Sequence, residues 1–395
     1  MKKELGQFMT PPAIAKLVAK ELGRCDVAID LAVGDGSLLK AVSDISKKPV
    51  QLIGFDIDRR MVRAAQSALP SAHVRNANGL KARLASGSLF GKVGIAGNPP
   101  FLGDVPDDAG WIRRALPDAQ GRKGSDRAEI QFLARALVIG RSVGARIAII
   151  LPIGFADGDT YGRIRTSLME NYCVRKCIEV VGAPFHDTEA RTVVLVIDTA
   201  GTRPTPTEIC EFDARTEQIV RISKKRLVPG TRLDARYHRL QTLMTGTAMV
   251  LKDLRVSITR GLYSRKEAKL LNVEALHTSD LAKACAGRLI INRRPPADRR
   301  HHVVAEEGDI LLSRTGSRVS WNPVVLHAGR APITDHVFRI RAPEAVRDLV
   351  YQSFTHPSFD TWLRGISKGV CATVITKREL LEMPVFAWDE SRANA

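Results

Sequence analysis

The stretch Val93-Gly-Ile-Ala-Gly-Asn-Pro-Pro-Phe101 joins a short apolar run to a stiff tetrapeptide. The run is typical of the end of a buried strand in a parallel sheet, and ligands bind where such strands open at their carboxyl ends. The two prolines restrict two φ angles, and the first also holds Asn98 in an extended conformation. We therefore expect residues 98–101 to form a rigid loop at the ligand-binding edge of an α/β fold.

The chemistry of this loop favours a planar amine as its ligand. Because neither proline has an N–H group, the Asn98 side-chain oxygen and the neighbouring carbonyls can act together as acceptors. An exocyclic amino group has two hydrogens to donate to them, and Phe101 offers a flat apolar face on which its ring could stack. Asn-Pro also marks ordinary turns, so the tetrapeptide alone leaves a simple strand-to-loop turn equally open.

A second ligand-binding pattern lies near the start of the chain. Residues 27–31 are apolar and predict a strand, and Val33-Gly-Asp-Gly-Ser37 predicts a tight turn into a helix. Glycine permits that turn and lets a ligand come close to the backbone. Leu39 stands where a dinucleotide fingerprint has its third glycine, which favours a cofactor carrying an amino acid over one carrying a pyrophosphate.

Four stretches in the first half of the chain together resemble those of gamma-type adenine DNA methyltransferases. They are Gly6-Gln-Phe-Met-Thr-Pro-Pro12, Asp30-Leu-Ala-Val-Gly-Asp-Gly36, Gly54-Phe-Asp-Ile-Asp58 and Asn98-Pro-Pro-Phe101. The resemblance implies a doubly wound, Rossmann-like α/β domain that binds S-adenosylmethionine. Residues 13–22, whose apolar positions recur at helical spacing after two prolines, are expected to form a helix that begins over the cofactor.

The resemblance also implies which residues hold the cofactor. The N-terminal segment would contact its methionine end, Asp30 would accept from its ammonium group, and Asp56 would accept both ribose hydroxyls. Asn78 stands where the family usually has aspartate, and its side-chain carbonyl remains an acceptor for the adenine amino group. The full cofactor set is Gln7, Phe8, Thr10, Asp30, Gly34, Gly36, Asp56 and Asn78.

The resemblance implies a catalytic set of Asn98, Pro99, Pro100, Phe101 and Phe185. Asn98 and the Pro99 carbonyl would accept the two amino hydrogens of an adenine rotated out of the DNA stack. Phe101 and Phe185 would hold the base, although a core phenylalanine is the other interpretation of Phe185. Residues 102–127 are polar and too long for a compact connection, so we expect a lid over the target base. No metal is required.

The second half of the chain differs from the first in composition and in the elements that it predicts. Residues 199–206 have the composition of a linker and are expected to end the sheet domain. We therefore expect a methyltransferase domain at 1–200, a linker region at 201–235 and a smaller α+β domain at 236–395. Residues 303–316 and 373–384 resemble a target-recognition unit of type I restriction specificity subunits. Candidate DNA contacts, to bases or to phosphates, are Arg260, Arg265, Lys266, Asn292, Arg293 and Arg294.

The charge distribution favours double-stranded DNA as a partner. The formal net charge is +18, and residues 201–300 hold 21 Lys and Arg against 10 Asp and Glu, whereas residues 301–395 hold 11 of each. A concentrated basic surface attracts a polyanion through counterion release. No apolar run approaches membrane-spanning length and no signal peptide is evident, so we expect a cytoplasmic protein with no membrane partner. The six cysteines show no metal-binding spacing.

These observations predict a site-specific enzyme that methylates the N6 amino group of adenine in duplex DNA. Two alternatives share the Asn98 tetrapeptide: methylation of guanine in rRNA and methylation of glutamine in release factors. A third is a DNA-binding protein with a vestigial catalytic half. Neither half carries a nuclease signature, so a restriction activity would come from a separate endonuclease. The oligomeric state is left open.

Overall fold

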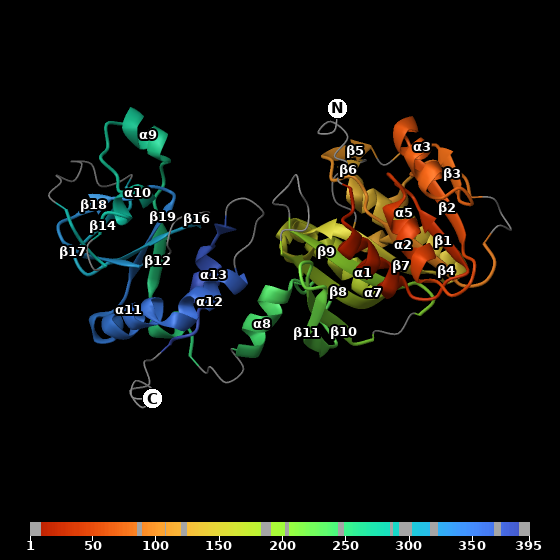
Figure 1. The fold of residues 1–395 in the computed structure, drawn as a ribbon. Coiled ribbons are helices and arrows are strands. Elements are labelled where there is room, and N and C mark those ends of the chain that lie inside the picture. Colours follow the sequence, from red (N-terminus) through yellow and green to blue (C-terminus); the bar gives the residue numbers. More distant parts are fainter. Residues whose placement is uncertain are drawn as a thin grey trace. The chain divides into compact units, whose positions relative to one another are not determined.

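The computed structural model divides the chain into two compact units, Met1–His238 and Arg239–Ala395 (Figure 1). Each unit has hydrophobic cores of its own. The residues that the structure describes are 9–84, 89–106, 108–119, 125–182, 191–201, 205–243, 249–284, 287–291, 302–316, 323–366 and 373–386.

The first unit is built on a nine-stranded sheet with the order β11-β10-β8-β9-β7-β4-β1-β2-β3. The strands from β3 to β7 in this order are parallel to one another, and β9 runs antiparallel to both β7 and β8. The carboxyl ends of β1, β2 and β4 therefore meet at one edge. The strands are β1 Val27–Asp30, β2 Gln51–Asp56, β3 His73–Asn76, β4 Val93–Gly97, β7 Arg146–Pro152, β8 Cys173–Val181, β9 Thr192–Asp198, β10 Thr207–Asp213 and β11 Gln218–Lys225.

Helices cover both faces of this sheet, as a doubly wound fold requires. Along β1, Val27 and Ile29 face one core and Ala28 faces the other, because successive side chains alternate between the faces of a sheet. One face carries α1 Pro12–Leu22, α2 Ser37–Ile45 and α3 Arg59–Ala68; the other carries α4 Trp111–Ala115, α5 Ala128–Val143, α6 Ile153–Asp157 and α7 Gly162–Asn171, with short 3-10 turns at Pro117–Ala119 and Asp159–Tyr161. The expected Rossmann-like fold is confirmed.

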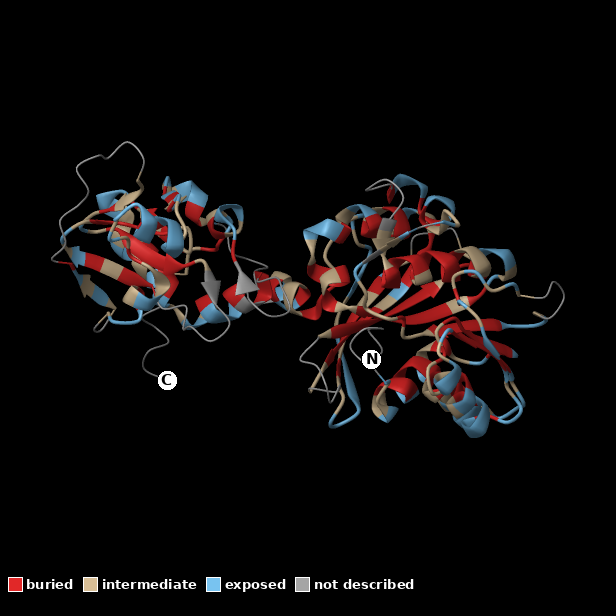
Figure 2. Cartoon of the chain, turned by 90° about the horizontal axis from the view of Figure 1, so that it is seen from above, coloured by how far each residue is buried: buried red, intermediate tan, exposed pale blue. Residues whose placement is uncertain are grey.

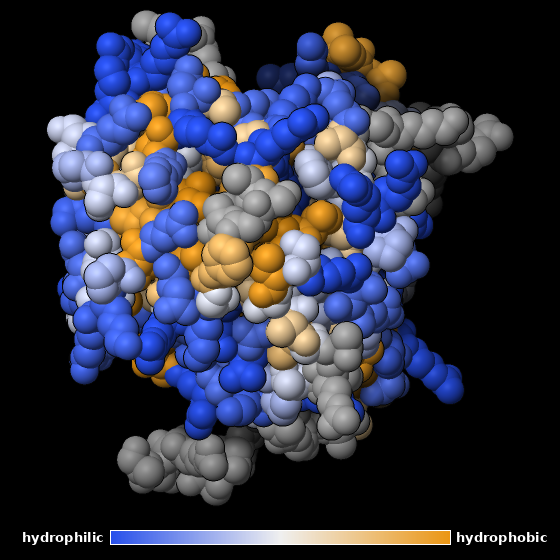
Figure 3. Space-filling model, turned by 90° about the vertical axis from the view of Figure 1, so that its right-hand side faces the viewer, coloured by the Kyte–Doolittle hydropathy of each residue, from blue (hydrophilic) through white to orange (hydrophobic). Residues whose placement is uncertain are grey.

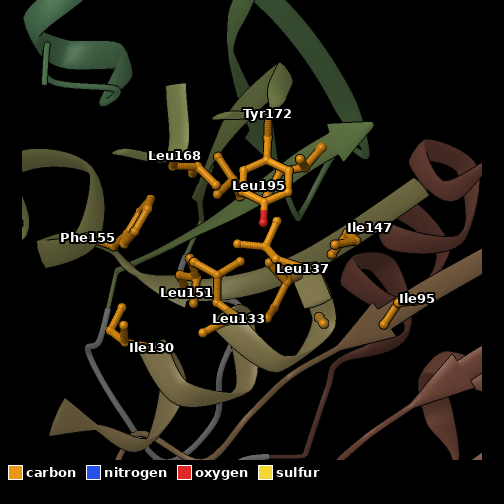
Figure 4. Packing of buried hydrophobic residues seen from close by; sticks show 14 of the residues in the cluster. Ile95, Ile130, Leu133, Leu137, Ile147, Leu151, Phe155, Leu168, Tyr172 and Leu195 are labelled. Atoms are coloured by element: carbon orange, nitrogen blue, oxygen red, sulfur yellow. The ribbon is translucent and has the colours of Figure 1, made fainter. Parts of the chain in front are cut away.

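The two cores follow from these alternating faces. Figure 2 shows the buried residues concentrated on the strands and on the inner sides of the helices. Figure 4 shows Leu133 and Leu137 of α5 packed with Leu151 and Leu195 of the sheet. On the face of the molecule drawn in Figure 3, apolar residues lie in several groups within a mostly hydrophilic surface.

The stretch that was expected to be a linker contains two strands of the sheet. β10 pairs in parallel with β8, and β11 pairs antiparallel with β10. Ile209, Cys210 and Phe212 of β10 are buried, so this strand contributes to the core. The sheet therefore does not end before residue 199. The Thr and Pro content of residues 199–206 marks a connection inside the first unit.

The described part of the segment expected to be a lid contains short elements of its own. β5 Asp104–Pro106 pairs antiparallel with β6 Ser125–Arg127, and α4 lies between them. The pairing brings the two ends of the segment together next to the start of α5.

The second unit is a smaller α+β structure around a five-stranded sheet with the order β12-β19-β15-β17-β13. Trp362 and Phe354 are fully buried in its main core. Its strands are β12 Ser257–Arg260, β13 Arg288–Ile290, β14 Val304–Ala305, β15 Ile310–Ser313, β16 Thr315–Gly316, β17 Val324–Ala328, β18 Ala331–Pro332, β19 Val337–Arg341 and β20 Thr373–Val374. Its helices are α9 Arg265–Leu270, α10 Thr278–Leu281, α11 Arg347–Thr355, α12 Pro357–Ile366 and α13 Lys377–Leu381, with 3-10 turns at Leu251–Leu254 and Glu344–Val346.

One helix, α8 Ala235–Leu243, contains the boundary between the two units. In the part of the chain that the structure describes, no helix combines the length and the apolar character needed to cross a membrane.

Candidate active site

A cavity of about 380 Å³ lies at the carboxyl ends of the parallel strands of the first unit. β1 ends at Asp30, β2 ends at Asp56, and Asn98 directly follows β4. Topology therefore brings together residues that are far apart in the sequence. Of the residues predicted to form the site, those lining the cavity are Thr10, Asp30, Gly34, Asp56, Asn78, Asn98 and Pro100.

The carboxylate of Asp56 holds in place the glycine loop, which consists of residues 31–36 between β1 and α2. One oxygen of Asp56 accepts from the N–H of Gly34 at 2.9 Å, and the other accepts from the N–H of Asp58 at 2.8 Å. Gly36 has a φ of +88° and begins α2 from the left-handed region, which residues with a side chain rarely adopt. The loop between β1 and α2 is thus tied to the end of β2.

Asp30 is the most buried carboxylate in the cavity lining. Its side chain is 1% exposed and accepts a hydrogen bond from the N–H of Ala32 at 2.9 Å. Burial, with smaller contributions from the nearby carboxylates Asp56 and Asp35, raises the pKa of Asp30 to about 7. Burial also raises the pKa of Asp56. Because a cation close to Asp30 would relieve both effects, this end of the cavity suits an ammonium group.

Asn98 is connected to the N-terminal segment. Its side-chain Nδ2 donates to Thr10 Oγ1 at 3.0 Å, across 88 positions of sequence. With the NH2 group directed at Thr10, the carbonyl oxygen lies on the other branch of the amide. Pro99 is buried, and Phe101 is half-buried and packs against the core that contains α1 and α2 rather than lining the cavity.

The loop after β3 forms the opposite end of the cavity. Asn78 is exposed, and its side-chain oxygen accepts from the N–H of Leu80 at 2.9 Å. Gly79 is buried against the end of β1, where a Cβ atom would overlap the carbonyl oxygen of Leu31. The position therefore requires glycine.

Replacing Gly79 with alanine is expected to lower the free energy of unfolding by about 2–3 kcal/mol, because the new methyl group displaces the backbone of Leu31. Gly103→Ala is the matched control, since no atom lies within 4 Å of a Cβ at that position. It should stay within about 0.5 kcal/mol of the wild type. Urea unfolding of the three proteins measures the difference. Equal free energies of unfolding would show that residue 79 does not pack closely against the backbone of Leu31.

The segment expected to be a lid contacts the loop after β3. Trp111 Nε1 donates to the carbonyl oxygen of Leu80 at 3.0 Å, and Lys81 Nζ forms an ion pair with Asp108 Oδ2 at 2.9 Å. Trp111, Lys81 and Asp108 all line the cavity, together with Val105. The described part of this segment therefore covers the cavity on the side of Asn78.

Several residues that were predicted to bind DNA or the cofactor do not lie in the described lining of this cavity. Arg260 ends β12, and Arg265 and Lys266 lie in the first turn of α9; all three are exposed on the second unit. The positions that lie outside the described residues are Gln7, Phe8, Phe185, Asn292, Arg293 and Arg294.

Trp111 and Gln131 are among the lining residues that were not predicted to form the site. Gln131 lies on α5, on the side that packs into the unit, and is 1% exposed. A polar residue among the apolar positions of this helix was the only signal in the sequence, and such a signal does not say which cavity the side chain faces.

The fold and the cavity define the class of protein: a Rossmann-like methyltransferase domain with a second, smaller α+β unit. Residues 1–232 match the family model described as N-6 DNA Methylase, and the chain belongs to this family. The family implies S-adenosylmethionine as the methyl donor, in agreement with the expected cofactor. No curated protein matches the chain.

Solved structures share this fold. The chain is similar to the type IIG restriction endonuclease BpuSI, with a TM-score of 0.53 and 13% identity over 95% of this chain and 58% of that chain. It is similar to the type IIL restriction-modification enzyme MmeI, solved in complex with DNA, with a TM-score of 0.51 and 11% identity over 97% and 64%. The methyltransferase subunit of a type I restriction-modification system from Streptococcus thermophilus matches with a TM-score of 0.45 and 20% identity over 61% and 54%. The chain thus spans between 54% and 64% of these proteins.

Proposed function

We propose that this protein methylates the N6 amino group of adenine at specific sites in double-stranded DNA. The observation that carries the proposal is the position of Asn98, which follows β4 and lines the same cavity as Asp30 and Asp56. Membership of the N-6 DNA Methylase family supports it and does not favour rRNA guanine or protein glutamine as the substrate.

The residues of the cavity fit S-adenosylmethionine. Asp30 is a buried carboxylate whose raised pKa calls for a cationic partner, and it would hold the ammonium group of the methionine end. Asp56 would accept the ribose hydroxyls, and Gly34 leaves room for the ligand beside the backbone. When bound, the cofactor supplies an electrophilic methyl group.

In the proposed reaction, Asn98 orients the target amine. Its side-chain oxygen and the carbonyl of Pro99 accept the two amino hydrogens, and this places the nitrogen lone pair toward the methyl group. Thr10 orients the Asn98 amide, because its hydroxyl oxygen accepts a hydrogen bond from the NH2 group of Asn98. Phe101 and Phe185 would hold the base after it leaves the DNA stack.

We assign the second unit to recognition of the DNA sequence. The proposal is that the protein is a gamma-type enzyme, in which the first unit carries catalysis and residues from 239 onward carry the target-recognition domain. Two similar restriction enzymes match over both units, and MmeI was solved with DNA bound. Any cleavage activity would come from a separate endonuclease.

The proposal is tested with tritium-labelled S-adenosylmethionine and duplex DNA, followed by digestion to nucleosides and chromatography. Label is expected in N6-methyldeoxyadenosine. Parallel reactions contain ribosomal RNA and a release factor in place of DNA. Label in either of these and none in DNA would overturn the proposal. Binding of DNA without transfer to any of the three substrates would favour a vestigial catalytic half.

Replacing both Arg265 and Lys266 with alanine is expected to weaken DNA binding, because both are exposed cations in the first turn of α9. If both contact phosphates, the slope of log K against log salt falls by about 1.8. Fluorescence anisotropy over a salt series measures it. Lys252→Ala is the control, since Lys252 already pairs with Glu382 at 3.0 Å. An unchanged slope in the double variant would remove these residues from the DNA contact.

A further inference from the structure

Gln131 is a buried polar side chain that faces the candidate cofactor cavity from α5. It is 1% exposed, and its neighbours Ala128 and Phe132 line the same cavity. A buried amide lowers stability unless both its donor and its acceptor groups find hydrogen-bond partners. The partners of each end therefore indicate what the side chain is for.

The donor end of Gln131 is held by the backbone. Nε2 donates to the carbonyl oxygen of Val105 at 2.6 Å and lies 3.4 Å from that of Asp126. Because both neighbours are acceptors, the NH2 group must face them, and this settles which branch of the amide is nitrogen. The side-chain oxygen consequently lies on the opposite branch.

The acceptor end of Gln131 opens into the cavity. Within the described residues, no group donates a hydrogen bond to this oxygen. Because Gln131 lines the cavity and its NH2 group is directed at the backbone, its oxygen is the end of the amide that can face a ligand. Its position suits a ligand that carries a hydrogen-bond donor.

This face of α5 meets the loop after β3. Arg135, one turn further along the helix, donates to the carbonyl oxygen of Ala82 and lies 5.1 Å from the ring of Trp111. A Cβ on Gly79 would lie 3.2 Å from the ring of Phe132. Gln131 and Asn78 line the same cavity, and the family resemblance assigns Asn78 to the adenine of the cofactor.

Asn78 is poorly suited to recognise that adenine alone. Its side-chain oxygen already accepts the N–H of Leu80, and it has no second carboxylate oxygen to offer. Gln131 provides a buried acceptor whose direction is fixed by two hydrogen bonds at its donor end. Burial strengthens such an interaction and penalises a ligand that fails to make it.

We propose that Gln131 is a specificity-determining residue that accepts a hydrogen bond from the exocyclic amino group of the cofactor's adenine. The inference rests on the proposed function and deepens it at the same cavity. It also links ligand recognition to the covering segment, because the hydrogen bond from Gln131 to Val105 holds β5 in place.

The test compares two ligands that differ at this one group, S-adenosylhomocysteine and S-inosylhomocysteine, which has a carbonyl oxygen in place of the amine. Isothermal titration of the full chain is expected to show at least about tenfold weaker binding of the inosyl compound to the wild type. In Gln131→Met, which keeps the length of the side chain without the acceptor, the ratio should fall to about threefold or less. Most of the change should come from weaker binding of S-adenosylhomocysteine.

Two further variants separate the contribution of Gln131 from general damage. Trp111→Phe removes the hydrogen bond to Leu80 and should weaken both ligands alike, so that their ratio is kept. Asn78→Ala should also keep the ratio. A ratio unchanged in Gln131→Met, or lost only in Asn78→Ala, would overturn the inference while leaving the proposed function intact. Failure of the wild type to bind either compound would overturn both.

Discussion

Replacing Asn98 with alanine is expected to lower the rate of methyl transfer to DNA by about 100- to 1,000-fold. The substitution removes the side-chain oxygen that accepts one amino hydrogen, and the amine loses the orientation that exposes its lone pair. Single-turnover assays with labelled cofactor measure the rate directly. Binding of S-adenosylhomocysteine should stay within about twofold of the wild type, because Asn98 is assigned to the target base.

Asn98→Asp is the matched comparison for this prediction. Aspartate has nearly the same shape and keeps an acceptor oxygen, but it lacks the NH2 group that donates to Thr10. It should therefore retain more activity than the alanine variant and less than the wild type. Transfer by Asn98→Ala at the wild-type rate would contradict the assignment of this residue to catalysis.

Binding of S-adenosylhomocysteine is expected to weaken about tenfold between pH 8 and pH 6. Burial raises the pKa of Asp30 to about 7 in the ligand-free protein, so that its carboxyl is mostly ionised at pH 8 and mostly protonated at pH 6. The ammonium group of the ligand favours the ionised form, and binding at low pH must therefore release a proton. Isothermal titration in buffers with different ionisation enthalpies measures both the affinity and the released proton.

Asp30→Asn serves as the control for this pH dependence. It should bind the ligand at least about tenfold more weakly at pH 8, because it lacks the charge that pairs with the ammonium, and its affinity should be nearly constant from pH 6 to pH 8. An equally flat profile in the wild type would show that Asp30 does not contact the ligand.

The raised pKa of Asp30 also affects the stability of the ligand-free protein. Here the contribution of Asp30 falls as the pH rises, whereas ligand binding strengthens. The folded state binds a proton at Asp30 more tightly than the unfolded chain does. Asp30 therefore favours the fold at a pH below its ordinary value of 3.8, and this advantage is lost as the pH rises to about 7. Relative to the wild type, Asp30→Asn should thus gain in melting temperature as the pH rises over this range.

Local patterns in the sequence were sufficient for the elements around the cofactor loop. The helix expected at 13–22 is α1, the strand expected at 27–31 is β1, and the strand expected to end before Asn98 is β4. Each is a short segment whose apolar residues follow one period without interruption. Whether such a segment forms a helix or a strand depends on which of its faces are buried. The spacing of its own apolar residues already specifies these faces.

Elements that depend on distant partners were predicted less well. β10 is a strand because it pairs with β8, and β11 is a strand because it pairs with β10. Composition alone suggested a linker there. The covering segment likewise gains its order from the pairing of β5 with β6 and from the contact of Trp111 with Leu80. None of these contacts is visible in a local pattern.

The order of motifs along the chain was enough to indicate a methyltransferase fold, a sulfonium cofactor and an acceptor loop at residues 98–101, because each motif carries its chemistry within a few adjacent residues. Only the folded chain decides that Thr10 contacts Asn98 and that Gln131 lines the same cavity as Asn78. These relations join side chains that are between 53 and 88 positions apart. They arise where separate strands and helices end at one edge of a sheet, and a linear pattern does not contain that geometry.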